Sequence, residues 1–256
     1  MAYLHGKFVW FEHVSNAIDK ARAFYEPLFG WKNEAMPMGP ESYLMIKNGA
    51  DPIGGYRKPS MGEPPHWISY LSVADVDASA KAAQAAGAKV LMPPTDFGPV
   101  GRGAAIADPT GAVFCIWKGA QDDPADVKTT PQGGWLWNEC VTQDEKKALA
   151  FYEKVFGFTH DAMPMESPGG GHGTYYVLKQ GDAGRGGIMK CPMPGVPSHW
   201  LPYAAVSDCD ASLALAKKLG AKEMVPATDI PNIGRFAVFT DPLGAALAVM
   251  KPNPAM

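Results

Sequence analysis

The chain repeats itself. Residues 8–38 match residues 135–165 with 15 identities in 31 positions, and residues 64–118 match residues 197–251 with 24 identities in 55. Extended self-similarity of this kind is the sequence signature of a duplicated structural unit. A polar stretch rich in Pro and Gly separates the two copies, as is typical of a linker. We therefore expect two homologous domains at residues 1–119 and 135–256, joined by a linker at residues 120–134.

Composition excludes several functional classes. Of the 256 residues, 46% are hydrophobic and 19% are charged, with a net charge of -3, which is ordinary for a globular protein. The basic residues are scattered, so no nucleic-acid footprint is expected. No apolar run approaches the roughly 18 residues of a membrane helix, and the first residues lack the pattern of a signal peptide. We expect a cytoplasmic protein with neither a nucleic-acid nor a membrane partner. The four cysteines occupy unmatched positions in the two copies, which indicates neither a disulfide framework nor a zinc site.

Hydrophobic periodicity and glycine punctuation give the same order of elements in each half of a copy: one strand, one helix and three short strands. In the first half we expect strands at 8–14, 32–36, 42–47 and 53–57 and a helix at 19–29. In the second half we expect strands at 67–73, 88–92, 102–107 and 112–118 and a helix at 75–86. The whole chain is then an α+β protein of four βαβββ modules.

Three short motifs recur in both copies. They are Phe-Tyr near the end of the first helix, Val-x-Asp-x-Asp before the second helix, and Asp-Pro-x-Gly-Ala before the last strand. They stand at Phe24-Tyr25, Val73–Asp77 and Asp108–Ala112, and again at Phe151-Tyr152, Val206–Asp210 and Asp241–Ala245. In these motifs and in module order the chain resembles the vicinal oxygen chelate superfamily, the glyoxalase, bleomycin-resistance protein and dioxygenase group, in its tandem two-domain form. The resemblance implies two glyoxalase-like domains, each with a cupped β-sheet that holds a ligand on its concave face.

Enzymes of that superfamily bind a divalent metal through His or Gln on a module's first strand and Glu on its last strand. Here the resemblance places Trp10 and Trp137 at the first-strand positions, and an indole offers no lone pair to a metal. It places Cys115 and Ala248 at the last-strand Glu positions. We therefore expect the usual metal site to be absent and no cofactor to be bound.

A shifted site stays open as an alternative. Residues two apart on a strand share a face, so Trp10 and Glu12 should point the same way. Glu12 with His66, and Glu139 with His199, could form a displaced metal or acid/base centre. A histidine at a strand edge can equally be a structural hydrogen bonder.

Glu12 and Glu139 are the candidate catalytic residues. A carboxylate among apolar neighbours is partly desolvated, which suits a general base or the recognition of a donor group on a ligand. The alternative is a carboxylate that pairs with an arginine or a backbone donor at a module junction. Both interpretations explain why each copy carries the residue.

Further candidates for ligand contact are aromatic or basic. Aromatic rings with few polar groups suit a flat ligand, although core packing explains them equally. Arginines beside the last turn could bind an anion or pair with a nearby carboxylate. These candidates are Trp10, Tyr43, Tyr70, Trp137, Tyr175, Tyr203, Arg102 and Arg235.

The main hypothesis is that the chain binds a small apolar or aromatic molecule without the usual metal. A metal-dependent lyase or dioxygenase that uses the shifted Glu and His set is the alternative. A protein whose cups are filled by side chains, acting through its surface, is the third interpretation. One chain already contains paired modules and needs no second copy to form them. We therefore expect a monomer or a homodimer.

Overall fold

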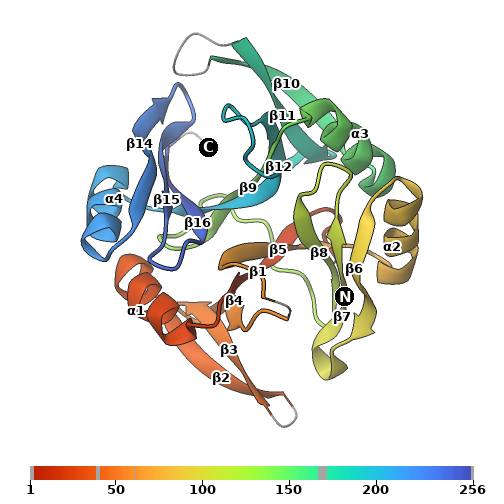
Figure 1. Cartoon of the computed structure of the whole chain (residues 1–256), viewed down its shortest axis with the longest axis horizontal. Coiled ribbons are helices and arrows are strands. Elements are labelled where there is room, and N and C mark those ends of the chain that lie inside the picture. Colours follow the sequence, from red (N-terminus) through yellow and green to blue (C-terminus); the bar gives the residue numbers. More distant parts are fainter. Residues whose placement is uncertain (1–2, 39–40, 61, 167–171, 255–256) are drawn as a thin grey trace. The chain divides into compact units, whose positions relative to one another are not determined.

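The computed structural model describes residues 3–38, 41–60, 62–166 and 172–254. Each half of each copy forms one strand, one helix and three further strands (Figure 1). The first copy contains β1 (Phe8–Val14), α1 (Ile18–Phe29), β2 (Lys32–Met38), β3 (Glu41–Asn48), β4 (Asp51–Arg57), β5 (His66–Ser72), α2 (Val76–Ala85), β6 (Lys89–Asp96), the 3-10 turn η1 (Gly98–Val100), β7 (Gly101–Ala107) and β8 (Val113–Gly119). The second copy contains β9 (Trp135–Thr142), α3 (Glu145–Phe156), β10 (Thr159–Glu166), β11 (His172–Gln180), β12 (Ala183–Lys190), β13 (His199–Ala205), α4 (Cys209–Lys218), β14 (Lys222–Ile230), β15 (Gly234–Thr240) and β16 (Ala246–Pro252).

The predicted α+β class and the four βαβββ modules are confirmed. The strands form two eight-stranded sheets, in the orders β2-β3-β4-β1-β5-β8-β7-β6 and β10-β11-β12-β9-β13-β16-β15-β14. Within each module the first and last strands pair in parallel, while the three strands after the helix pair antiparallel. No described helix is both long enough and apolar enough to span a membrane.

Several strands are longer than predicted, and β6 extends furthest beyond its predicted end. β6 runs through Pro93 and Pro94 to Asp96, whereas the sequence pattern predicted an end at residue 92. Proline cannot donate to a sheet ladder, so it is tolerated mainly in edge strands and at bulges, and the pairing of β6 with β7 shifts register between Met92 and Thr95. β6 is the last strand of its sheet, so its outer side needs no such donors.

The helix ends follow ordinary capping chemistry. Gly30 and Gly157 end α1 and α3 with φ of 75° and 67°, in the left-handed region that glycine adopts without strain. Asp75 and Asp208 cap α2 and α4 by accepting hydrogen bonds from backbone amides three residues on. The first aspartate of each Val-x-Asp-x-Asp motif is thus a helix cap.

The described chain forms two compact units, and each takes residues from both sequence repeats. Unit 1 comprises Met1–Val9, Ser69–Ala125 and Trp137–Trp200, and unit 2 comprises Trp10–Ile68, Asp126–Leu136 and Leu201–Met256. The domain boundaries expected from the repeat, 1–119 and 135–256, stay a prediction. Each unit is described by itself below.

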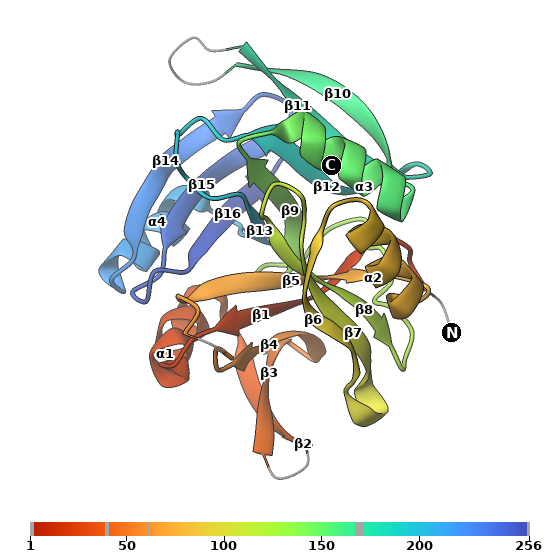
Figure 2. The same cartoon turned by 45° about the vertical axis from the view of Figure 1, so that its right-hand side comes forward.

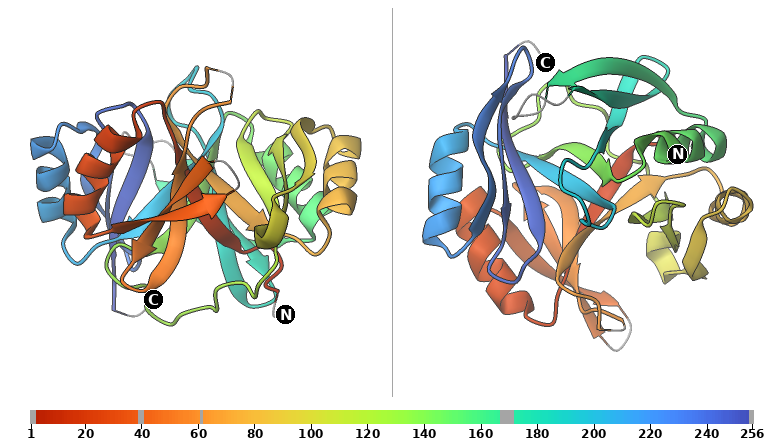
Figure 3. Two further views of the ribbon diagram at one scale, coloured as in Figure 1. Left: turned by 90° about the horizontal axis from the view of Figure 1, so that it is seen from below. Right: turned by 45° about the horizontal axis from the view of Figure 1, so that its top comes forward.

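In unit 1, helix α2 packs on β6, β7 and β8, and it also contacts α3, which lies on β12 (Figure 2). The buried cluster between these elements combines Leu71, Ile106 and Phe114 with Tyr152 and Trp200. In unit 2, α4 packs on β14, β15 and β16 and contacts α1 (Figure 3). Each core is thus built from one module of each repeat.

Candidate functional site

In unit 2, a polar chain joins three of the predicted residues. The indole N–H of Trp10 donates to the hydroxyl of Tyr43 at 2.9 Å, and that hydroxyl donates to Oε1 of Glu12 at 2.7 Å. Trp10 and Glu12 thus share one face of β1, as the strand period predicts. Glu12 is only 6% exposed, whereas the two aromatic residues are half-buried. The site therefore presents partly exposed rings with a carboxylate beneath them.

A glycine makes room for this arrangement. Gly55 lies opposite Glu12 in the pairing of β4 with β1, and a Cβ on Gly55 would stand 1.9 Å from the Tyr43 hydroxyl oxygen. Any residue other than glycine would push the phenol away from the carboxylate. The position of Gly55 thus permits the hydrogen bond between Tyr43 and Glu12.

Arg57 holds the other side of the carboxylate. Its Nε donates to Oε2 of Glu12 at 3.1 Å, while Nη1 donates to the Lys58 carbonyl and lies 3.7 Å from Glu63. This is the arginine pairing that the sequence left open as an alternative for Glu12. Burial of Tyr43 and the adjacent Glu12 charge raise the pKa of the Tyr43 phenol well above its usual value, so the phenol stays protonated and donates.

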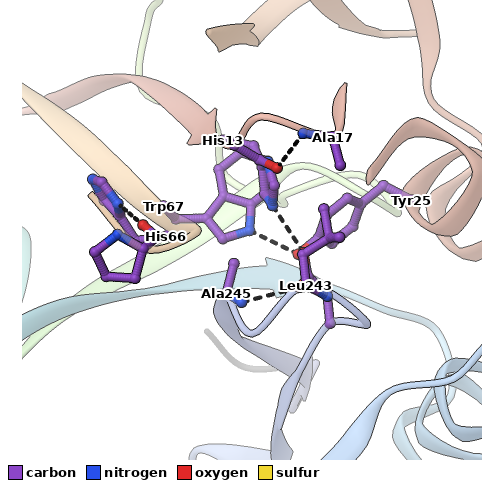
Figure 4. A network of polar contacts seen from close by, with 10 residues as sticks. His13, Ala17, Tyr25, His66, Trp67, Leu243 and Ala245 are labelled. Atoms are coloured by element: carbon purple, nitrogen blue, oxygen red, sulfur yellow. Dashed lines mark hydrogen bonds and ion pairs between the residues drawn. The ribbon is translucent and has the colours of Figure 1, made fainter. Parts of the chain in front are cut away.

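His66 stands at the start of β5 in the same unit. Its Nδ1–H donates to the Pro64 carbonyl at 2.8 Å, which leaves Nε2 as the acceptor nitrogen of the neutral ring (Figure 4). Burial, and next the Arg57 charge, lower the His66 pKa against the opposing effects of the Pro64 carbonyl and Glu63. The imidazole is therefore neutral at physiological pH.

Unit 1 contains the same series of hydrogen bonds, formed by residues of the second repeat. The indole N–H of Trp137 donates to the Tyr175 hydroxyl at 2.7 Å, and Tyr175 bonds to Glu139, which is 7% exposed. Burial and then the Glu139 charge raise the pKa of Tyr175 well above its usual value. A Cβ on Gly187, opposite Glu139, would again lie 1.9 Å from the tyrosine oxygen. We call the two groups, Trp10–Tyr43–Glu12 and Trp137–Tyr175–Glu139, the Trp–Tyr–Glu clusters.

The position of Arg57 is not conserved between the two repeats of the chain. Arg57 pairs with Val14 on β1, and the equivalent residue beside Val141 on β9 is Met189. His199 repeats the geometry of His66, because its Nδ1–H donates to the Pro197 carbonyl at 2.9 Å. The sequence analysis did not single out Arg57 or the two glycines. The repeat could not reveal Arg57, since its counterpart is a methionine, but a shared glycine at both positions was a usable signal.

The other predicted residues have different partners. Arg102 in unit 1 forms a bidentate pair with Asp77 and a further pair with Asp96, and Arg235 in unit 2 does the same with Asp210 and Asp229. This matches the carboxylate-pairing alternative. It also explains the second aspartate of the Val-x-Asp-x-Asp motif.

The remaining two tyrosines contact aromatic rings of their own modules. Tyr70 packs edge-on against Trp117 in unit 1, with ring centroids 5.9 Å apart. Tyr203 packs against Phe236 in unit 2 at 6.3 Å. Both contacts are of the core-packing kind, and a role in ligand binding for these residues stays a prediction.

A second polar network lies inside unit 2 and accounts for the Phe-Tyr and Asp-Pro motifs. Oδ2 of Asp241 accepts from Tyr25 at 3.0 Å and bonds His13 Nε2 at 2.8 Å, and Trp67 Nε1 donates to the Tyr25 hydroxyl at 2.9 Å (Figure 4). Oδ1 of Asp241 accepts from two backbone amides of its own turn. His13 and Tyr25 are fully buried, so this network is closed to a ligand.

The ionisation of Asp241 follows from its partners. Burial raises its pKa, but the hydrogen bond and charge of His13 and the backbone amides of the turn outweigh burial and lower it overall. Unit 1 repeats the network with Asp108, Tyr152 and Trp200, and a buried Cys140 stands where unit 2 has His13. In both units the motif tyrosine of one repeat thus binds the motif aspartate of the other.

The donor set does not fit the metal implied by the resemblance. Among residues 3–38, 41–60, 62–166 and 172–254, no three His, Cys, Asp or Glu side chains gather closely enough to hold a metal ion. The indole N–H groups of Trp10 and Trp137 are hydrogen-bond donors, which cannot act as metal ligands. Cys115 and Ala248, at the last-strand positions, are buried. The absence of a metal site stays a prediction.

Two surface cavities of unit 1 lie away from the clusters. One, of about 360 Å³, includes Tyr3, Ser72 and Asp123 in its lining, and the other, of about 200 Å³, includes Lys147 and Phe151. No predicted site residue lines either cavity.

The fold and the motifs together define the class of protein. Residues 7–116 and 139–249 each match the family model of the Glyoxalase/Bleomycin resistance protein/Dioxygenase superfamily. The chain belongs to this superfamily, as its sequence motifs indicated.

Relatives match over almost the full chain. CFP32 of Mycobacterium tuberculosis, whose name proposes a glyoxylase, is 39% identical over 258 residues, covering 98% of this chain and 97% of that protein. The anthracycline biosynthesis protein DnrV of Streptomyces peucetius is 30% identical over 259 residues, covering 94% and 92% of the two chains.

Solved structures share the fold at low identity. The Mn(II)-bound glyoxalase of Novosphingobium aromaticivorans superposes with a TM-score of 0.65 at 18% identity, covering 98% of this chain and 83% of that one. The 2,2',3-trihydroxybiphenyl 1,2-dioxygenase of Sphingomonas wittichii superposes with a TM-score of 0.64 at 15% identity, covering 98% and 91%. At this identity the likeness concerns the fold alone.

Proposed function

We propose that the chain binds a small aromatic molecule at its Trp–Tyr–Glu clusters, without a divalent metal. The observation that carries the proposal is the duplicated cluster itself: each unit keeps half-buried Trp and Tyr rings over a buried carboxylate. Partly exposed rings with a few fixed polar groups are typical of sites for flat ligands.

Both copies keep a feature that weakens their strands. Glycine inside a strand lowers stability because its backbone loses more conformational entropy on folding than that of other residues, and because it has no side chain to pack. Gly55 and Gly187 nevertheless stand opposite the glutamates, where they admit the tyrosine hydroxyls. An apolar side chain would pack such a position better, so the geometry favours a site over plain core packing.

The contacts of Glu12 favour binding over proton transfer. Its two oxygens accept from Tyr43 and Arg57, an arrangement that holds a carboxylate as a fixed acceptor. His66 uses its Nδ1–H on the Pro64 carbonyl. The name of DnrV places that relative in the biosynthesis of anthracyclines, which are polycyclic aromatic compounds, and this supports an aromatic ligand here.

The test is a thermal-shift screen of the full chain with a library of mono- and polycyclic aromatic molecules, followed by calorimetric titration of the hits. A ligand at 100 times its Kd stabilises the folded state by about 2.7 kcal/mol, which a shift in Tm readily detects. We expect hits with the natural chain and their loss in the double variant Trp10→Leu, Trp137→Leu. Asp19→Asn is the control, because the Asp19 side chain is exposed in the first turn of α1 and is not a candidate for ligand contact.

Two results would overturn the proposal: a library without hits, or a double variant that is folded by circular dichroism and responds like the natural chain. Metal content by mass spectrometry, after soaking in Zn²⁺, Ni²⁺, Mn²⁺ or Fe²⁺ and desalting, tests the metal-free part. Stoichiometric metal that disappears in Glu12→Ala or His66→Ala would contradict it.

A further inference from the structure

The larger surface cavity of unit 1, of about 360 Å³, is lined by both a carboxylate and an ammonium group. Lys118 lines it from the end of β8, and Asp123 lines it from the segment that follows this strand. A cavity of this volume falls within the range of sites for small molecules. No residue of the Trp–Tyr–Glu clusters takes part, so the cavity is a separate candidate site.

The Asp123 carboxylate is held in place through one of its oxygens. Its Oδ2 accepts from the Leu4 amide at 2.7 Å and from the Ser72 hydroxyl at 2.6 Å. Among the described residues, none bonds to Oδ1. A carboxylate that is fixed in this way can accept a further hydrogen bond from a charged donor on a ligand.

The two opposite charges of the cavity do not pair with each other. Within residues 3–38, 41–60, 62–166 and 172–254, neither Asp123 nor Lys118 has an ion-pair partner. Lys47, Lys179 and Lys217, in contrast, each pair with a carboxylate. Opposite charges that line one hollow without meeting leave room for a ligand that carries one charge of each sign.

Tyr3 supplies an aromatic ring to the same lining. Its hydroxyl donates to Nδ1 of His5, and Nε2–H of His5 donates to the Phe156 carbonyl at 2.6 Å, so the ring is anchored. Tyr3 is nevertheless 39% exposed, and Ala74 and Gly119 line the cavity with it. An anchored and partly exposed ring can contact an apolar or aromatic side chain of a ligand.

The second repeat does not carry the same set of residues. The alignment of residues 64–118 with 197–251 places Ala205 at the position of Ser72 and Lys251 at the position of Lys118. Ala205 has no hydroxyl that could hold a carboxylate. Lys251 therefore provides a matched control for Lys118, outside the proposed site.

We propose that this cavity binds a free α-amino acid with an apolar side chain. The ligand ammonium donates to Asp123, the ligand carboxylate accepts from Lys118, and the side chain contacts the Tyr3 ring. Only a ligand with both charges returns a partner to each protein group from which it removes water. This site is independent of the function proposed for the Trp–Tyr–Glu clusters.

Three probes of similar shape test the need for both charges. L-phenylalanine carries both, 3-phenylpropionate lacks the ammonium, and 2-phenylethylamine lacks the carboxylate. We expect calorimetric titration of the full chain to show about tenfold weaker binding of each single-charge probe, because each leaves one protein charge without a partner.

Charge-removing variants assign each protein group to its part of the ligand. Asp123→Asn keeps an oxygen that can accept from Leu4 and Ser72, so we expect it to weaken L-phenylalanine binding about tenfold without weakening that of 3-phenylpropionate. Lys118→Met should weaken L-phenylalanine binding but not that of 2-phenylethylamine, and Lys251→Met should change neither. A general loss of structure would weaken all three probes together, which distinguishes it from these patterns.

The outcomes separate this site from the clusters. Equal binding of the three probes, no binding of L-phenylalanine, or unchanged binding in both Asp123→Asn and Lys118→Met would overturn the proposal. Binding that is lost in the double variant Trp10→Leu, Trp137→Leu but kept in Asp123→Asn would place the amino acid at the clusters, and would also overturn it. Binding that survives in the tryptophan variant and shows the charge-specific losses supports a separate amino-acid site.

Discussion

Gly55 and Gly187 show how a residue without a side chain can shape a site. A Cβ at either position would lie 1.9 Å from a tyrosine hydroxyl, and the next nearest atoms belong to the same ring. The ring is held by its bonds to a tryptophan and a glutamate, so it cannot rotate away without losing them. The polar partners and the space left by the glycine thus together determine where the hydroxyl stands.

Gly55→Ala should therefore destabilise the protein. Overpacking of this kind costs typically 1–3 kcal/mol, and we expect a decrease of about 2 kcal/mol in the free energy of unfolding. Urea denaturation measures it, and a double-mutant cycle with Tyr43→Leu provides the control, because the smaller side chain relieves the clash. An equal cost of Gly55→Ala in both backgrounds would show that the tyrosine is not the cause.

Arg57 pairs with Glu12 in unit 2, and Met189 stands at the matching position of unit 1. Removing one partner of a buried ion pair leaves a charge without compensation, which can cost several kcal/mol. The Arg57 side chain is 28% exposed, so we expect Arg57→Met to cost less, about 2 kcal/mol, by urea denaturation. Met189→Leu is the matched control and should cost under about 1.5 kcal/mol, as volume-conserving changes do. A similar cost for both variants would contradict a stabilising role for Arg57.

At the scale of elements, the turn before β16 is tied to α1 of the same unit. Asp241 binds Tyr25 of α1, and it also bonds to His13 of β1. The pKa of Asp241 is lowered in the folded protein, so the unfolded state binds more protons as the pH falls. The ionised Asp241 carboxylate therefore stabilises the folded protein above the unfolded pKa of about 3.9. This stabilisation is lost as the pH falls through the lower pKa of the folded state.

Asp241→Asn tests this link. The amide oxygen can still accept from the turn, but the amide nitrogen cannot accept from Tyr25 or His13. We expect a loss of about 3 kcal/mol at pH 7 by urea denaturation, because hydrogen-bonded buried charges are costly to disrupt. The difference between the natural chain and the variant should shrink as the pH falls below about 4. A difference independent of pH, or an equal effect of Asp19→Asn at the exposed end of α1, would contradict the assignment.

At the scale of the whole molecule, neither compact unit coincides with a sequence repeat. Unit 1 combines residues 69–125 with 137–200, and its buried cluster joins Phe114 of the first repeat to Tyr152 of the second. The buried cluster of unit 1 therefore takes residues from both sequence repeats.

A fragment of residues 1–119 should then fail to fold as a stable monomer. It lacks the second-repeat half of both cores, including Tyr152, Trp200 and Phe239. We expect weak near-UV circular dichroism or self-association, measured by analytical ultracentrifugation. A monomeric fragment with a cooperative unfolding transition would contradict this and would favour the boundaries expected from the repeat.

Much of the local structure was predictable because it depends on short-range chemistry. Strand alternation, glycine stops and aspartate caps act within a few residues, so the elements of all four modules follow from them. Strand alternation also predicted that Trp10 and Glu12 share a face, which their common partner Tyr43 confirms. The sequence could not show, however, that the Pro93-Pro94 segment belongs to a strand. Only the order of strands in the sheet shows that β6 is an edge strand, where prolines are tolerated.

By itself the sequence determined the family, the four modules and the candidate polar and aromatic residues, since these depend on motifs and periodicity. Only the tertiary structure decided their partners: Arg57 for Glu12, Asp77 for Arg102, and Asp241 for Tyr25. Residues 12 and 57, or 25 and 241, are far apart along the chain, and no local pattern encodes such pairs. They meet only because strand register and helix packing bring their atoms within hydrogen-bonding distance.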